Sequence, residues 1–175
     1  MEKNYKWEGI CIEPSAISYP NLIKNRNCKC DDTLIYNHTG VQKYYEINNT
    51  GYFNEYFSSI NQPSDNFKDY QLVDKKCDTL YNVLNKLRSA TMIHYLSIDT
   101  EGSEFDILKK FFEDEYIVDT KTWKRRILSI SIEHNFNESY RSEIKDLMEF
   151  YCYDKVNELT VDDVYVHKLY SHLAR

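Results

Sequence analysis

Three short segments of this 175-residue chain place acidic side chains at the end of an apolar run. The segments are "GICIE", "YLSIDTEGSE" and "ISIEHN", and the side chains in them that can do chemistry are Glu13, Asp99, Glu101, Glu133 and His134. Carboxylates accept hydrogen bonds from sugar hydroxyls, bind hard cations and take up protons. Three such segments predict one binding or catalytic site. The alternative is that polar residues simply close each strand at the solvent.

Glu13 ends the first apolar run and is followed by Pro14 and Ser15. A carboxylate at the end of a strand can accept hydrogen bonds from both vicinal hydroxyls of a ribose, as it does in dinucleotide sites. The alternative is a local interaction with the N-terminus of the following helix, where negative charge is stabilising.

The second segment continues past Asp99 as "TEGSE". Gly102 allows the backbone to turn sharply into a helix, whose N-terminal amides we expect to be exposed, with Ser103 or Thr100 as the cap. Asp99 and Glu101 suit three roles, which are orienting a substrate, binding a divalent cation through oxygen, and taking a proton.

The third segment ends in Glu133 and His134. His134 is the best candidate general base, because the unperturbed pKa of histidine lies near neutrality. A structural role inside the protein is the alternative for a single histidine.

The patterns around these segments predict strands that alternate with helices. Strands are expected over residues 9–13, 70–77, 93–99 and 127–135, and helices over residues 15–26, 80–89 and 138–151. Residues 100–115 are expected to turn into a further helix. This alternation is typical of an α/β fold with a mostly parallel sheet. In such sheets ligands bind outside the carboxyl ends of the strands, where all three acidic segments then lie.

Three further regions depart from that alternation. Residues 33–38 and 41–47 flank Thr39-Gly40 and predict a β-hairpin. Residues 153–159 and 162–169 are expected to close the chain as an antiparallel pair. Between these regions lies a polar stretch, residues 48–69, which we expect to be a long loop that helps select the ligand.

Composition excludes several classes of protein. The formal net charge of −6 argues against a protein that binds nucleic acid through its phosphates. No apolar run approaches the roughly 20 residues that span a membrane, and "MEKNYKWEG" lacks the apolar core of a signal peptide. We therefore expect a single cytoplasmic domain over residues 1–175 with no membrane partner. Its five cysteines are expected as thiols, and a lone Cys28-x-Cys30 predicts no zinc site.

The segments together resemble a known family. "WEGICIEPS", "YPNLIKNRNC", "CDTLYNVL", "IHYLSIDTEGSEFDILKKF", "ISIEHN" and "DDVYVHK" occur in the order found in FkbM-type methyltransferases and cover nearly the whole chain. The resemblance implies a Rossmann-like class I methyltransferase sheet and S-adenosylmethionine as the methyl donor. It also implies methyl transfer to a hydroxyl of a small molecule or sugar.

The resemblance assigns roles to individual residues. It implies that Glu13 and Pro14 contact the cofactor at its ribose, and that Asp99 and Gly102 lie beside its methionine part. Glu101 would join Asp99 near the acceptor. The same resemblance places Glu133 and His134 on the acceptor side.

The front of the chain departs from the family pattern. The family begins with a strand and a turn of the "D-x-G-A-N-x-G" kind, and neither occurs here. We therefore expect a sheet that lacks its first strand. Its edges would pair directly, take a strand from another chain by self-association, or belong to a longer protein. Two functional alternatives follow: a non-catalytic module that has lost cofactor binding, and a metal-dependent site at Asp99 and His134.

Overall fold

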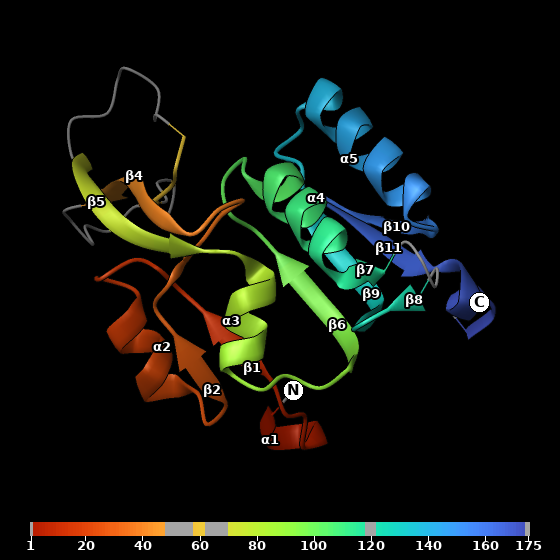
Figure 1. Cartoon of the computed structure of the whole chain (residues 1–175), viewed down its shortest axis with the longest axis horizontal. Coiled ribbons are helices and arrows are strands. Elements are labelled where there is room, and N and C mark those ends of the chain that lie inside the picture. Colours follow the sequence, from red (N-terminus) through yellow and green to blue (C-terminus); the bar gives the residue numbers. More distant parts are fainter. Residues whose placement is uncertain (1, 48–57, 62–69, 118–121, 174–175) are drawn as a thin grey trace. The chain divides into compact units, whose positions relative to one another are not determined.

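The computed structural model describes residues 2–47, 58–61, 70–117 and 122–173 (Figure 1). The chain forms two compact units, residues 1–89 and 90–175. Most of the predicted loop at residues 48–69 lies outside the described residues. The prediction of one domain stays a prediction.

The N-terminal part of the first unit contains a short parallel strand pair. It contains helix α1 (Glu2–Tyr5), strand β1 (Ile10–Ile12), helix α2 (Tyr19–Asn25) and strand β2 (Lys29–Asp31). Strands β1 and β2 pair in parallel. Pro20 lies in the first turn of α2, where its missing N–H costs nothing. The predicted strand ending at Glu13 and the helix after it are thus confirmed.

A three-stranded sheet completes the first unit together with helix α3 (Leu80–Lys86). Its strands are β3 (Leu34–Ile35), β5 (Tyr70–Asp78) and β4 (Gly40–Ile47), in that spatial order. The predicted hairpin between residues 33–38 and 41–47 is wrong, because β5 lies between β3 and β4. The long strand β5 pairs with the whole of β4, and Leu34 of β3, Tyr44 of β4 and Cys77 of β5 are buried together.

The second unit is built on a four-stranded sheet. Its strands are β6 (Met92–Ile98), β9 (Arg126–Glu133), β10 (Tyr153–Leu159) and β11 (Asp162–His167). The spatial order is β10-β11-β9-β6. Strand β6 is parallel to β9, whereas β11 is antiparallel to both of its neighbours, β9 and β10. Helix α4 (Glu104–Glu115) follows β6, and helix α5 (Glu138–Phe150) follows β9. The strands β7 (Tyr116–Ile117) and β8 (Thr122–Trp123) and a C-terminal 3-10 helix η1 (Lys168–Leu173) are short.

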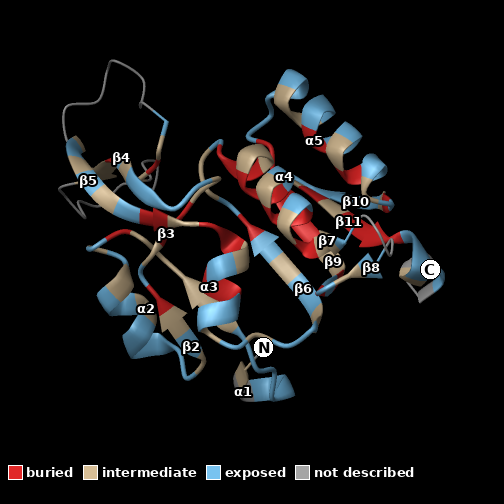
Figure 2. Ribbon diagram, viewed as in Figure 1, coloured by how far each residue is buried: buried red, intermediate tan, exposed pale blue. Residues whose placement is uncertain are grey.

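The core of the second unit lies between α4, α5 and the sheet. Figure 2 shows buried residues concentrated along α4, β9 and β11. Leu108, Phe111 and Phe112 of α4 are buried. Ile107 occupies the fourth buried apolar position, whereas Phe105 is only half-buried.

The fold is a mixed α/β arrangement with several sheets. The antiparallel C-terminal hairpin is confirmed by β10 and β11. The described strands do not form the single, mostly parallel sheet that the sequence predicts, because β4 and β5 pair antiparallel and β11 inserts antiparallel between β9 and β10. The alternation of strand and helix is therefore right, but pattern alone did not determine strand direction.

Candidate functional site: a carboxylate cluster at the ends of β6 and β9

Three predicted carboxylates converge in the second unit. Asp99 follows β6, Glu101 lies two residues further on, and Glu133 is the last residue of β9. Their carboxylate oxygens lie within 4.8 Å of one another. The parallel register of β6 and β9 pairs Ile98 with Ile132 and so brings the two strand ends to the same edge. The sequence prediction that these carboxylates meet is confirmed for these three.

The cluster shares a proton at neutral pH. Burial, the negative charge of Asp99 and a hydrogen bond to Asp99 raise the pKa of Glu133 to about 8. Burial also raises the pKa of Asp99, and burial together with the charge of Asp99 raises that of Glu101. Ionising all three carboxylates at this distance is unfavourable, so Glu133 keeps its proton and donates a hydrogen bond to Asp99. The Asn135 amide donates to Glu133 at 3.0 Å and to Glu101 at 3.4 Å.

The turn that carries Glu101 is held by a buried carboxylate. Glu104 is 1% exposed, and its Oε1 accepts hydrogen bonds from the Thr100 amide at 2.6 Å and the Thr100 hydroxyl at 2.9 Å. The Gly102 amide also donates to Glu104, at 3.1 Å. Glu101 and Gly102 have φ values of 58° and 96°, a left-handed conformation that favours glycine. Glu104 thus stabilises a strained turn at the site edge.

This turn corrects one detail of the prediction. The amides of Thr100 and Gly102 donate to Glu104 rather than standing exposed. The side chain of Ser103 makes no capping hydrogen bond to α4; its hydroxyl donates instead toward Thr100. Glu104 holds the turn before α4, whereas in the first turn of the helix itself the Phe105 amide donates to the Tyr140 hydroxyl.

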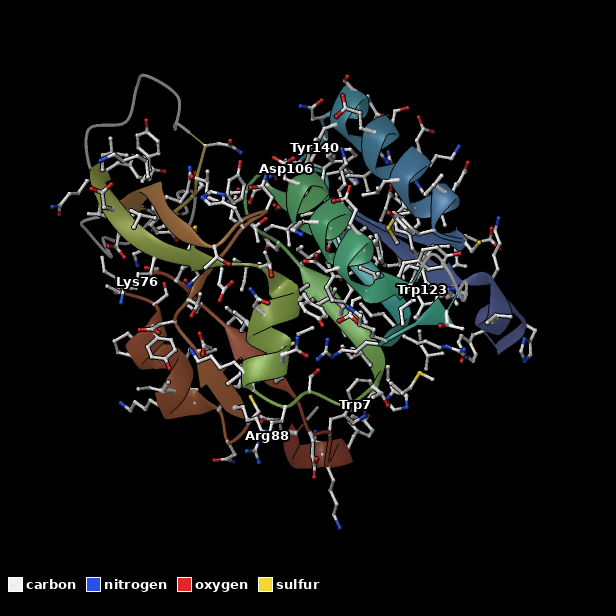
Figure 3. The ribbon with its side chains drawn as sticks, in the orientation of Figure 1. Trp7, Lys76, Arg88, Asp106, Trp123 and Tyr140 are labelled. Carbon is white, nitrogen blue, oxygen red and sulfur yellow. The ribbon has the colours of Figure 1, made fainter. Side chains whose placement is uncertain are left out.

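Two residues that shape this site, Glu104 and Tyr140, are not among the candidates that the sequence predicts. The Tyr140 hydroxyl of α5 donates to Glu104 at 2.7 Å and accepts a hydrogen bond from the Phe105 amide at 2.9 Å. In Figure 3 the labelled Tyr140 lies beside Asp106 near the start of α4. An acidic residue in the first turn of a helix was the one available signal for Glu104. Nothing in the local sequence marks Tyr140, whose contact with α4 is tertiary.

His134 lies next to Glu133 in the chain but has different partners. It is 2% exposed, and its Nδ1 accepts a hydrogen bond from the Phe136 amide at 3.1 Å. That bond leaves the proton of the neutral ring on Nε2, which lies 3.8 Å from Asp163. Among the described residues, the donor atoms that lie within 4.8 Å of one another belong to Asp99, Glu101 and Glu133, and His134 does not join them.

Asp163 anchors the far side of His134. Arg141 of α5 donates two hydrogen bonds to the Asp163 carboxylate, at 2.8 and 2.7 Å, and Lys155 lies 2.7 Å from it. Burial opposes ionisation of Asp163, but the bonds from Arg141 and Lys155 hold its pKa below the usual value. His134 therefore packs against an ionised carboxylate that is already paired with two cations.

Glu13 belongs to the first unit and lies just past β1. Its amide donates to the Asp31 carbonyl at 3.0 Å, and its Oε1 accepts a hydrogen bond from the Ser15 amide at 2.8 Å. Glu13 thus contacts the turn that follows it. Helix α2 begins only at Tyr19, so this contact is not the interaction with a helix N-terminus given as the alternative.

The turn after Glu13 is fixed by a half-buried ion pair. Lys75 of β5 donates to the Pro14 carbonyl and lies 3.1 Å from Glu46 of β4. Glu46 in turn accepts a hydrogen bond from the Ala16 amide at 2.6 Å. Two strands of the first unit therefore hold the backbone on which Glu13 stands.

The residues present fit two kinds of ligand. Three oxygen donors within 4.8 Å are the ligand type that a hard divalent cation takes. Glu13, at the carboxyl end of a parallel strand, is the type and position of residue that binds a ribose.

Fold and site define an α/β protein with carboxylates at the ends of parallel strands. Residues 1–163 match the family model described as methyltransferase FkbM domain. That match covers most of the 175 residues, so this chain belongs to the FkbM methyltransferase domain family. The family indicates a methyltransferase. Neither the comparison with curated proteins nor that with solved structures gives a significant match. In the described part of the chain, no helix is both long and apolar enough to cross a membrane.

Proposed function

We propose that this chain is an S-adenosylmethionine-dependent methyltransferase that methylates a hydroxyl group of a small molecule or sugar. The observation that carries the proposal is the proton-sharing cluster of Asp99, Glu101 and Glu133 in a chain of the FkbM family. The parallel pairs β1–β2 and β6–β9, each strand followed by a helix or turn, support a Rossmann-like class I sheet.

The carboxylate cluster supplies the base in this proposal. S-adenosylmethionine, when bound, supplies an electrophilic methyl group. Asp99 accepts the proton of the acceptor hydroxyl, and Glu133, which stays protonated up to about pH 8, donates a hydrogen bond to Asp99 or to the acceptor oxygen. Asn135 orients Glu101 and Glu133 through its amide.

His134 has a positioning role in this scheme. Its Nδ1 is occupied by the Phe136 amide, and its Nε2 faces Asp163. Asn135 and Phe136 both have positive φ values, 47° and 55°, so the hydrogen bond to His134 helps hold a strained turn after β9. The carboxylates are therefore better placed than His134 to act as the base.

Cofactor contacts are carried over from the family resemblance and fit the local geometry. We assign Glu13 and Pro14 to the ribose, and Asp99 and Gly102 to the methionine part. Charge-assisted hydrogen bonds from ribose hydroxyls to a carboxylate are strong, which makes Glu13 the most sensitive residue for a binding test.

Calorimetry with S-adenosylhomocysteine tests the proposal. We expect saturable binding to the full chain. Glu13→Gln should lower the affinity at least about tenfold, since one charge-assisted hydrogen bond contributes about 1.5–3 kcal/mol. Glu8→Gln, an exposed glutamate at the start of the same segment, is the matched control and should bind as the unaltered chain does. No detectable heat at millimolar ligand would reject the enzyme and support the non-catalytic alternative.

Methyl transfer itself separates the two candidate bases. With a radiolabelled methyl donor and a panel of polyols and sugars, Asp99→Asn should abolish transfer while leaving S-adenosylhomocysteine binding measurable. His134→Gln should retain part of the activity. Full activity of Asp99→Asn would remove Asp99 as the base.

A further inference from the structure

Three cysteine thiols gather where β1 and β2 pair. Cys11 lies in the middle of β1 and is in register with Cys30 of β2, while Cys28 directly precedes β2. All three are free thiols of intermediate burial, so small reagents can reach them. The proposed methyl transfer uses none of them.

Cys28 contacts both of the other cysteines. Its thiol donates a hydrogen bond to the Cys11 sulfur, with 3.4 Å between the two Sγ atoms. Cys30 also makes a side-chain hydrogen bond with Cys28, and its thiol is directed at the Cys28 carbonyl oxygen, 3.7 Å away. Cys11 is the one of the two that lies on the other strand from Cys28, so Cys11 and Cys28 are the pair considered for a bridge.

The backbone around this pair is fixed by the sheet. Parallel backbone pairing of Ile10 with Lys29 and of Cys11 with Cys30 holds β1 beside β2, and this pairing does not depend on the oxidation state of the thiols. A disulfide has a sulfur–sulfur bond of about 2.05 Å, so the two atoms must approach by about 1.4 Å.

We propose that Cys11 and Cys28 are a redox-active pair that forms a reversible disulfide with a low-molecular-weight disulfide, such as oxidised glutathione, as the oxidant. One protein thiol displaces a glutathione thiol and forms a mixed disulfide. The second protein thiol then displaces the other glutathione. Two protein thiols are oxidised to one disulfide, and one glutathione disulfide is reduced to two thiols.

The bridge encloses the segment that carries Glu13. Residues 11–28 include Glu13 and helix α2, so the disulfide closes a loop around them. In the reduced protein, burial and the hydrogen bond with Cys28 raise the pKa of Cys11 to about 11, which keeps that thiol protonated at neutral pH. Oxidation would link β1 covalently to the residue directly before β2.

Tryptic peptide mapping tests the proposal, because trypsin places each of the three cysteines in a different peptide. Cleavage after Lys6, Lys24, Arg26, Lys29 and Lys43 puts Cys11 in residues 7–24, Cys28 in residues 27–29 and Cys30 in residues 30–43. The reduced full chain is incubated with oxidised glutathione, alkylated and digested. We expect a product that joins residues 7–24 to residues 27–29, lighter than the two peptides by two hydrogens and absent after dithiothreitol.

Matched variants and a denatured sample complete the experiment. Cys30→Ser and Cys152→Ser should keep the linked product, and Cys28→Ser should lose it. In guanidinium chloride the same oxidant should give a mixture of linkages. The proposal is overturned if the native protein gives that same mixture, if residues 30–43 supply the main linkage, or if Cys11 and Cys28 acquire only glutathione while exposed Cys152 is also modified.

Discussion

The Tyr140 hydroxyl donates a 2.7 Å hydrogen bond to Glu104, and this contact connects helix α5 to the turn that carries Glu101. Glu104 is 1% exposed, so its carboxylate depends on protein donors in place of water. Burial and the negative charge of Glu104 raise the pKa of Tyr140 far above its usual value, which keeps the hydroxyl available as a donor. One buried carboxylate thus couples the two helices beside the carboxylate cluster.

Tyr140→Phe should lower the free energy of unfolding by about 1.5–3 kcal/mol. The substitution removes a hydrogen bond to a buried carboxylate and leaves one oxygen of Glu104 without that donor. Urea unfolding followed by fluorescence measures the change. Tyr5→Phe removes a hydroxyl from a residue that is 72% exposed and should change stability by less than about 0.5 kcal/mol. Equal effects of the two substitutions would contradict the role given to Tyr140.

Arg125→Ala should destabilise the protein by about 3–5 kcal/mol. Arg125 forms an ion pair with Glu115, and the two side chains are 9% and 0% exposed. The backbone amide of Arg125 also donates a hydrogen bond to Glu115 at 3.0 Å. Removing the cation leaves a buried carboxylate without its charge partner. Lys145→Ala, which breaks an exposed pair with Glu149, should cost no more than about 0.5 kcal/mol in the same urea measurement. A small effect of Arg125→Ala would mean that water reaches Glu115.

Glu133→Gln should change the pH dependence of stability. Glu133 titrates near its usual value of 4.5 when unfolded and near 8 when folded. Between those values the folded state binds one proton more, so the free energy of unfolding falls as pH rises. The slope from this group is at most about 1.4 kcal/mol per pH unit, the equivalent of one proton. Glu133→Gln removes that slope, so the variant should gain stability relative to the unaltered chain between pH 5 and 8.

The control for this pH experiment is Glu143→Gln, an exposed glutamate of α5. It should leave the slope between pH 5 and 8 unchanged. Urea midpoints at four pH values, with constant ionic strength, suffice for the comparison. Parallel pH profiles for Glu133→Gln and the unaltered chain would show that Glu133 is ionised in the folded protein, and proton sharing with Asp99 would be wrong.

Lys75→Met should destabilise the first unit by about 1–3 kcal/mol and, under the proposed function, also weaken binding of S-adenosylhomocysteine. The substitution keeps the apolar stem but removes the bond to the Pro14 carbonyl and the pair with Glu46. Lys43→Met is the matched control on β4, because its pair with Asp74 is more than half exposed on both sides. Weaker binding without loss of stability would place Lys75 at the ligand, whereas equal effects of the two substitutions would contradict the role of Lys75.

Local patterns were reliable where the physics is local. The apolar runs before Glu13, Asp99 and Glu133 are strands, and Pro20 lies in the first turn of its helix. Thr79 caps α3, because its hydroxyl accepts a hydrogen bond from the Asn82 amide. These features depend on neighbours within a few residues.

Patterns were unreliable where partners are distant in the chain. Residues 33–38 and 41–47 look like a hairpin, but strand β5, some thirty positions further on, pairs with both strands instead. The segment before β9 contains β8 and the buried Arg125, whose partner Glu115 ends α4, and nothing local in the sequence marks that pair. Long-range pairing decided both outcomes.

The sequence by itself determined the family resemblance and the residue types at the strand ends, because both are written in contiguous motifs. The tertiary structure decided which of those residues act together. Parallel pairing of β6 and β9 brings Asp99 and Glu133 close enough to share a proton, and packing of α5 places Tyr140 on Glu104. A pKa and a hydrogen bond depend on distances between side chains, and only the folded chain sets those distances.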